Sequence, residues 1–101
     1  MAVKVLIKRR FKVGDLQNAS MLMMKARYQA TRQPGYLSSE TLTGLNDPGK
    51  VVVASLWETE KVWNSWKKSP EREEYSAELR KLQQGETEFE YYVPGWQIEF
   101  D

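Results

Sequence analysis

Two residue types are missing from this chain altogether, since it contains no cysteine and no histidine. The lack of cysteine excludes disulfides, thiolate metal sites and a cysteine nucleophile. The lack of histidine removes the commonest general base, the commonest metal ligand and the usual proximal ligand of haem. We therefore expect no metal site, and any catalysis must use other side chains.

An excess of charge of one sign is missing too, because 15 lysines and arginines balance 14 aspartates and glutamates. A balanced chain has no electrostatic reason to bind nucleic acid or an anionic membrane. No apolar run approaches the roughly 20 residues that cross a bilayer. The opening segment 1–8 is too short and too charged for a signal peptide. We expect a cytoplasmic protein without nucleic-acid or membrane partners.

The chain does contain enough apolar residues for one core, at 41% of 101 residues. This size and composition predict a single domain over residues 1–101. A domain this small buries only about two-thirds of its unfolded surface, so association with a second copy would add useful burial.

The first third of the chain reads as a strand followed by a helix. Apolar residues alternate with lysines from Val3 to about Phe11, a period that is typical of a strand. Asp15 is a suitable N-cap for the next helix, and Pro34-Gly35 ends it. The apolar stripe of this helix is Leu16, Ala19, Met23, Ala26 and Ala30.

The rest of the chain reads as a hairpin, a helical region and a last strand. Strands are expected over 36–45 and 50–57, with the turn at 46–49. A short helix carrying Trp63 and Trp66 follows, and Ser69-Pro70 begins a second helical piece as N-cap and first residue. The last strand is expected over 87–93.

This order predicts an α+β fold of the ferredoxin-like type, β-α-β-β-α-β, with an antiparallel sheet and helices on one face. The first and third strands should be central, and the last strand should lie beside the first. Lys4, Lys8 and Arg10 would then oppose Glu88 and Glu90 as a cross-strand charge ladder.

The face of the sheet without helices is not uniformly polar. A monomer rarely exposes an apolar patch without a use. Packing two such sheets against each other would bury the patch, so we expect a homodimer rather than a stable monomer. The residues expected in the patch are Leu6, Leu37, Val52, Ala54 and Leu56.

Three short segments together resemble the antibiotic biosynthesis monooxygenase domain family of the dimeric α+β barrel group. Gln33-Pro34-Gly35-Tyr36-Leu37 enters the second strand, Trp57-Glu58-Thr59-Glu60 opens the short helix, and Trp66-Lys67-Lys68-Ser69-Pro70 joins the two helical pieces. The resemblance spans Val3 to Val93. It implies a homodimer whose sheets form a dimeric α/β barrel, with one cavity per subunit between sheet and helices. For some members it also implies oxygenation of polycyclic phenols without a metal, flavin or other cofactor.

A haem-degrading branch of the same family offers a sharper test. Its members carry an asparagine on the first strand, a tryptophan in the second helical region and a haem-ligating histidine ten positions later. Trp66 matches the tryptophan, but Ser76 stands where the histidine would be and the first strand has no asparagine. We therefore do not expect haem degradation by that mechanism.

Arg9, Trp66 and Tyr91 are the predicted catalytic residues. Alternation places Arg9 on the helix side of the first strand, where an arginine can bind a carboxylate or phenolate. Trp66 matches a family position, and its indole N–H is a donor. The Tyr91 hydroxyl could hold or deprotonate a phenol. Each has a structural alternative, which is a solvated strand end for the arginine and core packing for the two aromatic residues.

Further residues are predicted to bind the substrate. The tryptophans would line a flat aromatic pocket, although packing in the core or at an interface is the more common role of such residues. Glu40 could instead form a purely structural salt bridge with Arg27. The predicted substrate-binding residues are Trp57, Trp63, Tyr75, Ser55 and Glu40.

The sequence thus favours a cofactor-independent oxygenase acting on an aromatic or quinone-type small molecule. A non-catalytic dimeric module that binds a small apolar ligand would use the same pocket, and the lack of histidine and cysteine favours it slightly. RNA binding by the sheet is a poor alternative, because the expected positions on its open face carry no exposed aromatics on the central strands.

Overall fold

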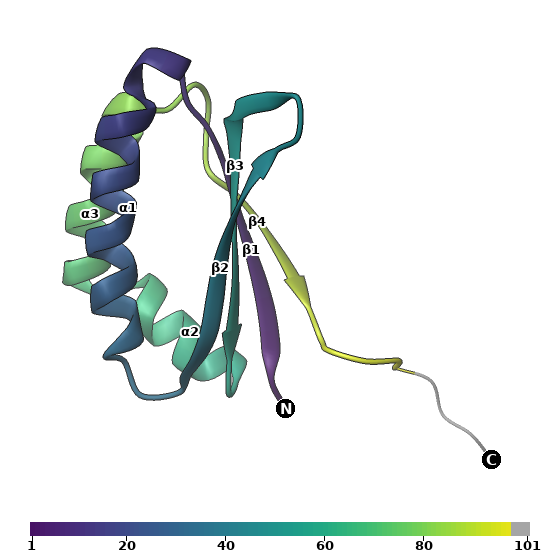
Figure 1. Ribbon diagram of the computed structural model, residues 1–101. Helices are drawn as coiled ribbons and strands as arrows, with labels where there is room; N and C mark the ends of the chain where they lie inside the picture. The colour runs from purple at the N-terminus through teal and green to yellow at the C-terminus, as the bar shows by residue number, and fades with distance from the viewer. Residues whose placement is uncertain (98–101) are drawn as a thin grey trace.

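A computed structural model describes residues 1–97 as a four-stranded sheet with helices packed on one of its faces (Figure 1). The predicted element order is confirmed, and the second helical region is divided in two. The elements are β1 (Val3–Arg10), a 3-10 turn (Val13–Asp15), α1 (Leu16–Thr31), β2 (Tyr36–Gly44), β3 (Asp47–Trp57), α2 (Glu60–Lys67), α3 (Pro70–Leu82) and β4 (Glu88–Tyr92).

The strands lie in the order β2-β3-β1-β4 and all neighbours are antiparallel. The prediction that the first and third strands are central is therefore confirmed. The expected charge ladder is only partly present. Lys8 forms an ion pair of 2.9 Å with Glu90, whereas Arg10 pairs at 2.8 Å with Asp47 at the start of β3.

The core lies between the sheet and the helices, because every second residue of β1 points toward the helical layer. Val5 is completely buried and Val3 and Ile7 are 7% exposed. They pack against the fully buried Trp57 and Trp63 in one cluster. The other cluster lies under α1 and α3 and consists of Phe11, Ala19, Val51 and Leu79.

The hairpin turn is shorter than predicted and lies earlier in the chain. Gly44 pairs with Asp47, so the turn consists of Leu45 and Asn46 rather than of residues 46–49. The segment 47–49 continues β3 because it is tied to the end of β1. The Phe11 amide donates to the Gly49 carbonyl at 2.8 Å, and Arg10 holds the carboxylate of Asp47.

An irregularity at the start of β2 decides which side chains face the helices. The register shifts between Tyr36 and Ser38. Beyond the shift, Ser39 and Thr41 pair with residues of β3 that face the helices, and Glu40 points to the opposite face. Gly35 precedes the shift with a φ of +84°, a conformation that favours glycine.

The caps of the helices agree with the sequence at α3 but not at α1. The Ser69 hydroxyl accepts a hydrogen bond of 3.2 Å from the amide of Arg72, and Pro70 is the first helical residue. Asp15 precedes α1 but its side chain forms no capping bond. A 3-10 turn ends at Asp15 and holds its backbone in a helical conformation, whereas an N-cap that accepts from its helix is usually extended.

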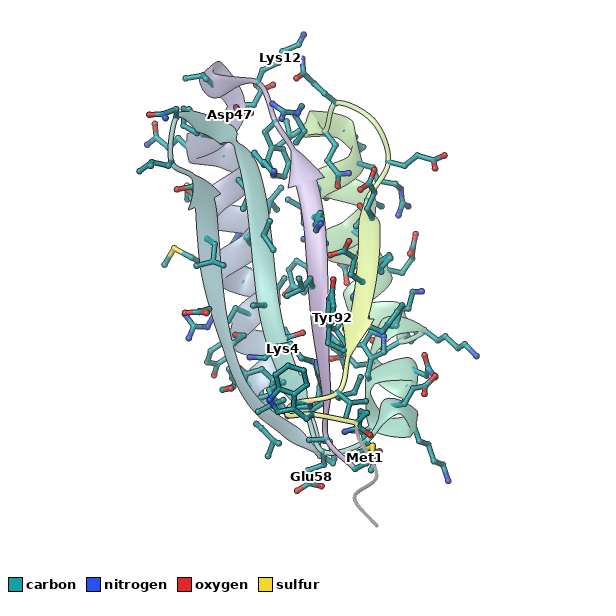
Figure 2. All side chains as sticks on the ribbon, turned by 90° about the vertical axis from the view of Figure 1, so that its right-hand side faces the viewer. Met1, Lys4, Lys12, Asp47, Glu58 and Tyr92 are labelled. Atoms are coloured by element: carbon teal, nitrogen blue, oxygen red, sulfur yellow. The ribbon has the colours of Figure 1, made fainter. Side chains whose placement is uncertain are left out.

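The other face of the sheet is free of helices and faces the viewer in Figure 2, where Lys4 and Tyr92 project from it. Leu37 and Leu42 are each 47% exposed. Leu6, Val52 and Leu56 are partly exposed there. Ala54 does not contribute as predicted, because it is 5% exposed between its neighbours. Within residues 1–97, no helix has the length and apolarity needed to cross a membrane.

Candidate functional site: a cavity between the helices and the sheet

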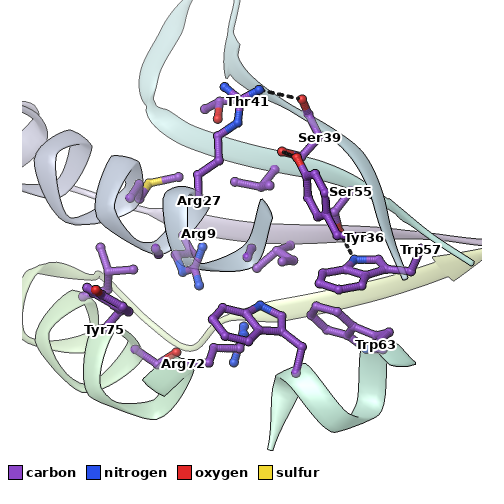
Figure 3. Close-up of a pocket in the computed structure, with 18 residues that line it drawn as sticks. Arg9, Arg27, Tyr36, Ser39, Thr41, Ser55, Trp57, Trp63, Arg72 and Tyr75 are labelled. Atoms are coloured by element: carbon purple, nitrogen blue, oxygen red, sulfur yellow. Dashed lines mark hydrogen bonds between the residues drawn. The ribbon is translucent and has the colours of Figure 1, made fainter. Parts of the chain in front are cut away.

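A cavity lies between the sheet, α1 and α3, with α2 at one end (Figure 3). The space open to the centres of water molecules is about 70 Å³. This is enough for several waters, since one needs roughly 10–15 Å³ by such a measure. Three kinds of side chain give the cavity its chemistry. They are the aromatic residues Tyr36, Trp57, Trp63, Trp66 and Tyr75, the arginines Arg9, Arg27 and Arg72, and the hydroxyl residues Ser39, Thr41, Ser55 and Ser76.

The aromatic wall is a continuous series of rings in edge-on or tilted contact. Tyr36 meets Trp57 in a T-shaped pair at 5.5 Å between ring centroids. Trp57 meets Trp63 at 5.7 Å, and Trp63 meets Phe89 of β4 at 6.0 Å. Pairs of this geometry contribute about 0.5–1.5 kcal/mol each beyond their burial, so the wall is rigid.

Ser55 lines the cavity as predicted, but hydrogen bonds within the protein largely occupy its hydroxyl. The hydroxyl donates to the Val5 carbonyl at 3.1 Å and accepts from Trp57 Nε1 at 3.1 Å. Its only hydrogen is therefore used, and one lone pair remains for a ligand. Ser55 holds the Trp57 ring in place more than it offers a binding group.

Trp66 and Trp63 reach the cavity from α2. They are 5% and 0% exposed, respectively. The Trp63 indole nitrogen is enclosed and has no hydrogen-bond partner. A buried N–H without an acceptor is uncommon in folded proteins. Both tryptophans that the sequence singled out line the cavity.

Arg9 faces the helical layer, as its place in β1 predicted, and it lines the cavity. Its Nε is enclosed and has no hydrogen-bond partner. Burial lowers the pKa of the Arg9 guanidinium well below its ordinary value, to about 10, and the positive charge of Arg72 contributes to this shift. Arg9 is still charged at neutral pH, but burial makes its charged form less favourable than it is in water.

Arg72 is the more deeply buried of the two arginines, since it is 9% exposed and Arg9 is partly exposed. Its guanidinium carbon lies 5.5 Å from the ring centroid of Trp63 and 5.5 Å from that of Phe89. Burial lowers the pKa of Arg72 as well, and its neighbour Glu73 counters this only in part. Both arginines line the cavity (Figure 3), and the charge of Arg72 acts on Arg9.

Among residues 1–97, no acidic side chain lines the cavity that holds these arginines. The ion pairs formed within residues 1–97 all lie elsewhere. They join Lys8 to Glu90, Arg10 to Asp47, Arg80 to Glu73 and Lys81 to Glu78. The interior of the site is therefore positively charged and aromatic at once.

Two predicted site residues lie outside the cavity. Tyr91 is 47% exposed, and its hydroxyl accepts a hydrogen bond from Lys67 Nζ at 3.3 Å. Its ring stacks on Phe89, which separates it from the cavity wall. Glu40 points to the helix-free face because of the register shift in β2. Its expected salt bridge with Arg27 is not formed, since that arginine donates to the Ser39 carbonyl at 3.3 Å.

Tyr75 lines the cavity as predicted, whereas Tyr36 and Arg72 were not identified from the sequence. Arg72 did carry a signal. It is the third residue of α3, and a cation in the first turn of a helix opposes the helix dipole. A basic residue at that place, beside the acidic Glu71 and Glu73, is locally unfavourable. It therefore indicates that the side chain makes contacts with other elements of the fold.

The arrangement is suited to a flat anionic molecule. Aromatic rings provide flat walls, and the arginines offer charge-assisted donors to oxygen atoms. No group of three or more aspartate or glutamate residues within 1–97 is arranged to hold a metal ion. Tyr75 and the serine and threonine hydroxyls are the other groups that could exchange protons.

Comparison with known proteins identifies the structures and the family that this chain resembles. Several solved structures share the fold over nearly all of the chain. A conserved protein from Methanosarcina mazei Go1 has a TM-score of 0.86 at 20% identity, with 91% of each chain covered. SnoaB, a cofactor-independent oxygenase from Streptomyces nogalater, has a TM-score of 0.84 at 14% identity, with 96% of each chain covered. Rv0793 from Mycobacterium tuberculosis has a TM-score of 0.84 at 13% identity and covers 98% of this chain and 100% of its own.

These identities are too low to show more than a shared fold, and no curated protein sequence matches the chain significantly. The sequence itself gives the stronger result. The model of the antibiotic biosynthesis monooxygenase family matches residues 23–78, which include most of α1, the β2–β3 hairpin, α2 and most of α3. This match extends over more than half of the chain, and the protein therefore belongs to the antibiotic biosynthesis monooxygenase family.

Proposed function

We propose that this protein is a cofactor-independent monooxygenase that acts on an aromatic or quinol-type small molecule bound in the cavity. One observation carries the proposal, which is an aromatic-walled cavity lined by the buried Arg72 and the partly buried Arg9, with no acidic side chain of residues 1–97 in its lining. Its membership of the family and the fold it shares with a cofactor-independent oxygenase support the same activity.

The chemistry begins with ionisation of the substrate. A phenol or enol bound beside Arg9 and Arg72 becomes more acidic, because their positive charges favour its anion. The electron-rich anion passes one electron to dioxygen, and the two radicals then join through a new C–O bond. One oxygen atom ends in a new carbonyl group. The other leaves as water with two hydrogens from the oxidised carbon, so no external reductant is needed.

The side chains around the cavity would divide this work. Arg9 would hold the anionic oxygen, and the Trp66 indole would donate to a second oxygen or pack on the substrate ring. Trp57 and Trp63 would form the flat wall and keep bulk water out. Tyr75 would relay the proton that leaves the substrate.

The helix-free face supports a homodimer with a barrel formed by the two sheets. Leu37 and Leu42 are half exposed on this side, and Leu6, Val52 and Leu56 are partly exposed between them and β4. A second copy of the sheet would bury these apolar residues and leave the charged residues at the rim.

Light scattering after size exclusion tests the dimer. We expect the mass of two chains, and Val52→Glu should shift it to one chain by placing a carboxylate at the centre of the interface. A wild-type protein that remains a single chain at micromolar concentration would contradict the proposal.

A dimeric binding module for a small ligand is the second candidate function. It is favoured by the lack of a carboxylate or imidazole base in the cavity. Such a module would bind the same molecules without consuming oxygen.

Oxygen uptake by metal-stripped protein separates the two functions. With an anthrone or a naphthoquinol as substrate, the wild type should consume oxygen faster than buffer does. Arg9→Gln and Trp66→Phe should each reduce kcat/KM at least tenfold, which corresponds to about 1.4 kcal/mol of transition-state stabilisation. Arg80→Gln is the matched control, because Arg80 is exposed on α3 and paired with Glu73. Equal uptake by all variants would refute the site, and no uptake with tight binding would favour the module.

A further inference from the structure

We propose that the substrate is an aromatic carboxylate, and that Arg9 and Arg72 together bind its carboxylate group. The inference rests on the proposed function only in taking the helix–sheet cavity as the binding site. It adds the chemical class of the ligand and assigns a binding role to Arg72.

The first reason is the state of the two guanidinium groups. Neither forms an ion pair or a side-chain hydrogen bond with any residue in 1–97, and Arg9 Nε is enclosed without an acceptor. Fully or largely buried arginines are almost always paired, because an uncompensated buried charge is costly. The exposed Arg10 and Arg80 on the same protein are both paired with carboxylates. Arg9 and Arg72 therefore have no carboxylate partner among residues 1–97, and a ligand could supply one.

The second reason is that the surroundings do not neutralise the pair. Arg72 lies over the rings of Trp63 and Phe89, and such cation–π contacts contribute about 0.5–2 kcal/mol without removing net charge. Glu73 is the acidic residue of α3 that acts on the charge of Arg72, but it is exposed and bound to Arg80 at the helix surface. Two like charges thus line one cavity, and an anion that binds to both relieves their repulsion and supplies a counter-charge.

The shape and chemistry of the cavity select the kind of anion. A carboxylate has two oxygens in one plane, which match the planar donor fork of a guanidinium. The remaining wall is aromatic and apolar, formed largely by Trp57, Trp63 and Trp66, and suits a ring attached to that carboxylate.

A carboxylate would also help the proposed chemistry. The one negative charge of the carboxylate balances one of the two positive charges, and the net positive charge that remains stabilises the phenolate or enolate that forms next to the ring. A hydroxylated aromatic acid therefore fits the charge of the site better than a neutral quinol does.

The protein allows a direct binding assay, because it contains four tryptophans and all but Trp96 line the cavity. Trp96 is 86% exposed, so Trp96→Phe removes a background signal without touching the core. In this background, fluorescence titration and calorimetry compare 2-naphthoate with 2-naphthamide, which has the same shape and no charge. We expect the carboxylate to bind at least tenfold more tightly.

Variants assign the preference to the two arginines. Arg9→Gln and Arg72→Gln should each weaken 2-naphthoate binding at least tenfold and leave 2-naphthamide within about threefold. Arg80→Gln should change neither. Circular dichroism confirms that each variant is folded, and the amide serves as an internal test that the pocket persists.

The outcomes separate this inference from the proposed function. Equal affinity for acid and amide would overturn the inference even if neutral quinols are oxidised. A carboxylate preference that both Gln variants abolish would establish it, even if no oxygen is consumed and the oxygenase proposal fails. A carboxylate preference that survives in both Gln variants would also overturn it, because the charge would then be bound elsewhere.

Discussion

The buried charge of Arg9 should make the protein less stable than a version without it. The guanidinium pKa falls by more than two units, to about 10, when the chain folds, mainly through burial. Each tenfold loss of proton affinity is worth about 1.4 kcal/mol, so the charged form costs about 3 kcal/mol in the ligand-free protein. Arg9→Met keeps an unbranched apolar stem and removes the charge. We expect it to raise the free energy of unfolding by about 1–3 kcal/mol.

Urea and thermal denaturation at neutral pH measure this gain. Each kcal/mol corresponds to a rise in Tm of about 4–8 °C for a domain of this size. Arg10→Met is the matched control on the same strand, since Arg10 is exposed and paired with Asp47. It should change stability little or reduce it slightly. Protein concentration must be equal in all samples, because a dimer couples stability to concentration.

The pH dependence of the gain follows from the sign of the pKa change. A base whose pKa is lower in the folded state contributes stability that is complete above pH 12.5 and is lost as the pH falls through about 10. The cost is therefore present in full at neutral pH. The advantage of Arg9→Met over wild type should shrink as the pH rises above about 10. If the variant is less stable than wild type at pH 7, the claim that Arg9 is an uncompensated buried charge is wrong.

Two further predictions concern the local structure. Gly35→Ala should destabilise the protein by about 1–3 kcal/mol, because a Cβ at this positive φ would come within 2.6 Å of Val62 Cγ2. Gly14→Ala, where no atom lies within 4 Å, is its control and should have little effect on Tm. Ser69→Ala should cost about 1 kcal/mol in urea denaturation by removing the N-cap of α3, whereas Ser65→Ala on the exposed surface of α2 should not. Equal losses in either pair would contradict the corresponding account.

The parts of the fold that the sequence predicted are those set by simple periodicity. Val3, Val5 and Ile7 alternate with polar residues, and a strand places alternate side chains on opposite faces. The same counting put Arg9 on the helix side, where it lies. The N-cap at Ser69 was predictable because a serine, a proline and two acids in the first turn form a strong local signal.

The errors arose where alternation is interrupted. The register shift between Tyr36 and Ser38 moves the later residues of β2 by one position and reverses their faces. Glu40 therefore points away from the cavity, whereas Ser39 and Thr41 line it. Tyr91 lies outside the cavity for a different reason. It stacks beyond Phe89 near the end of β4, where the helices no longer cover it.

Arg72 could not be identified from periodicity, because a charged residue on a helix normally faces solvent. It is buried here since α3 turns this position toward the rings of Trp63 and Phe89. Tertiary contacts between elements distant in the sequence thus decide the charge of the site, and only the structure reveals them.

Isotope labelling tests the central claim most directly. Metal-stripped protein is incubated with an anthrone under ¹⁸O₂, and the product and its rate of formation are measured by mass spectrometry against buffer alone. The account predicts formation above the buffer rate, one ¹⁸O atom in the new carbonyl of each product molecule, and at least a tenfold loss of that rate in Arg9→Gln. A rate equal to that of buffer, or one that Arg9→Gln leaves unchanged, would contradict it.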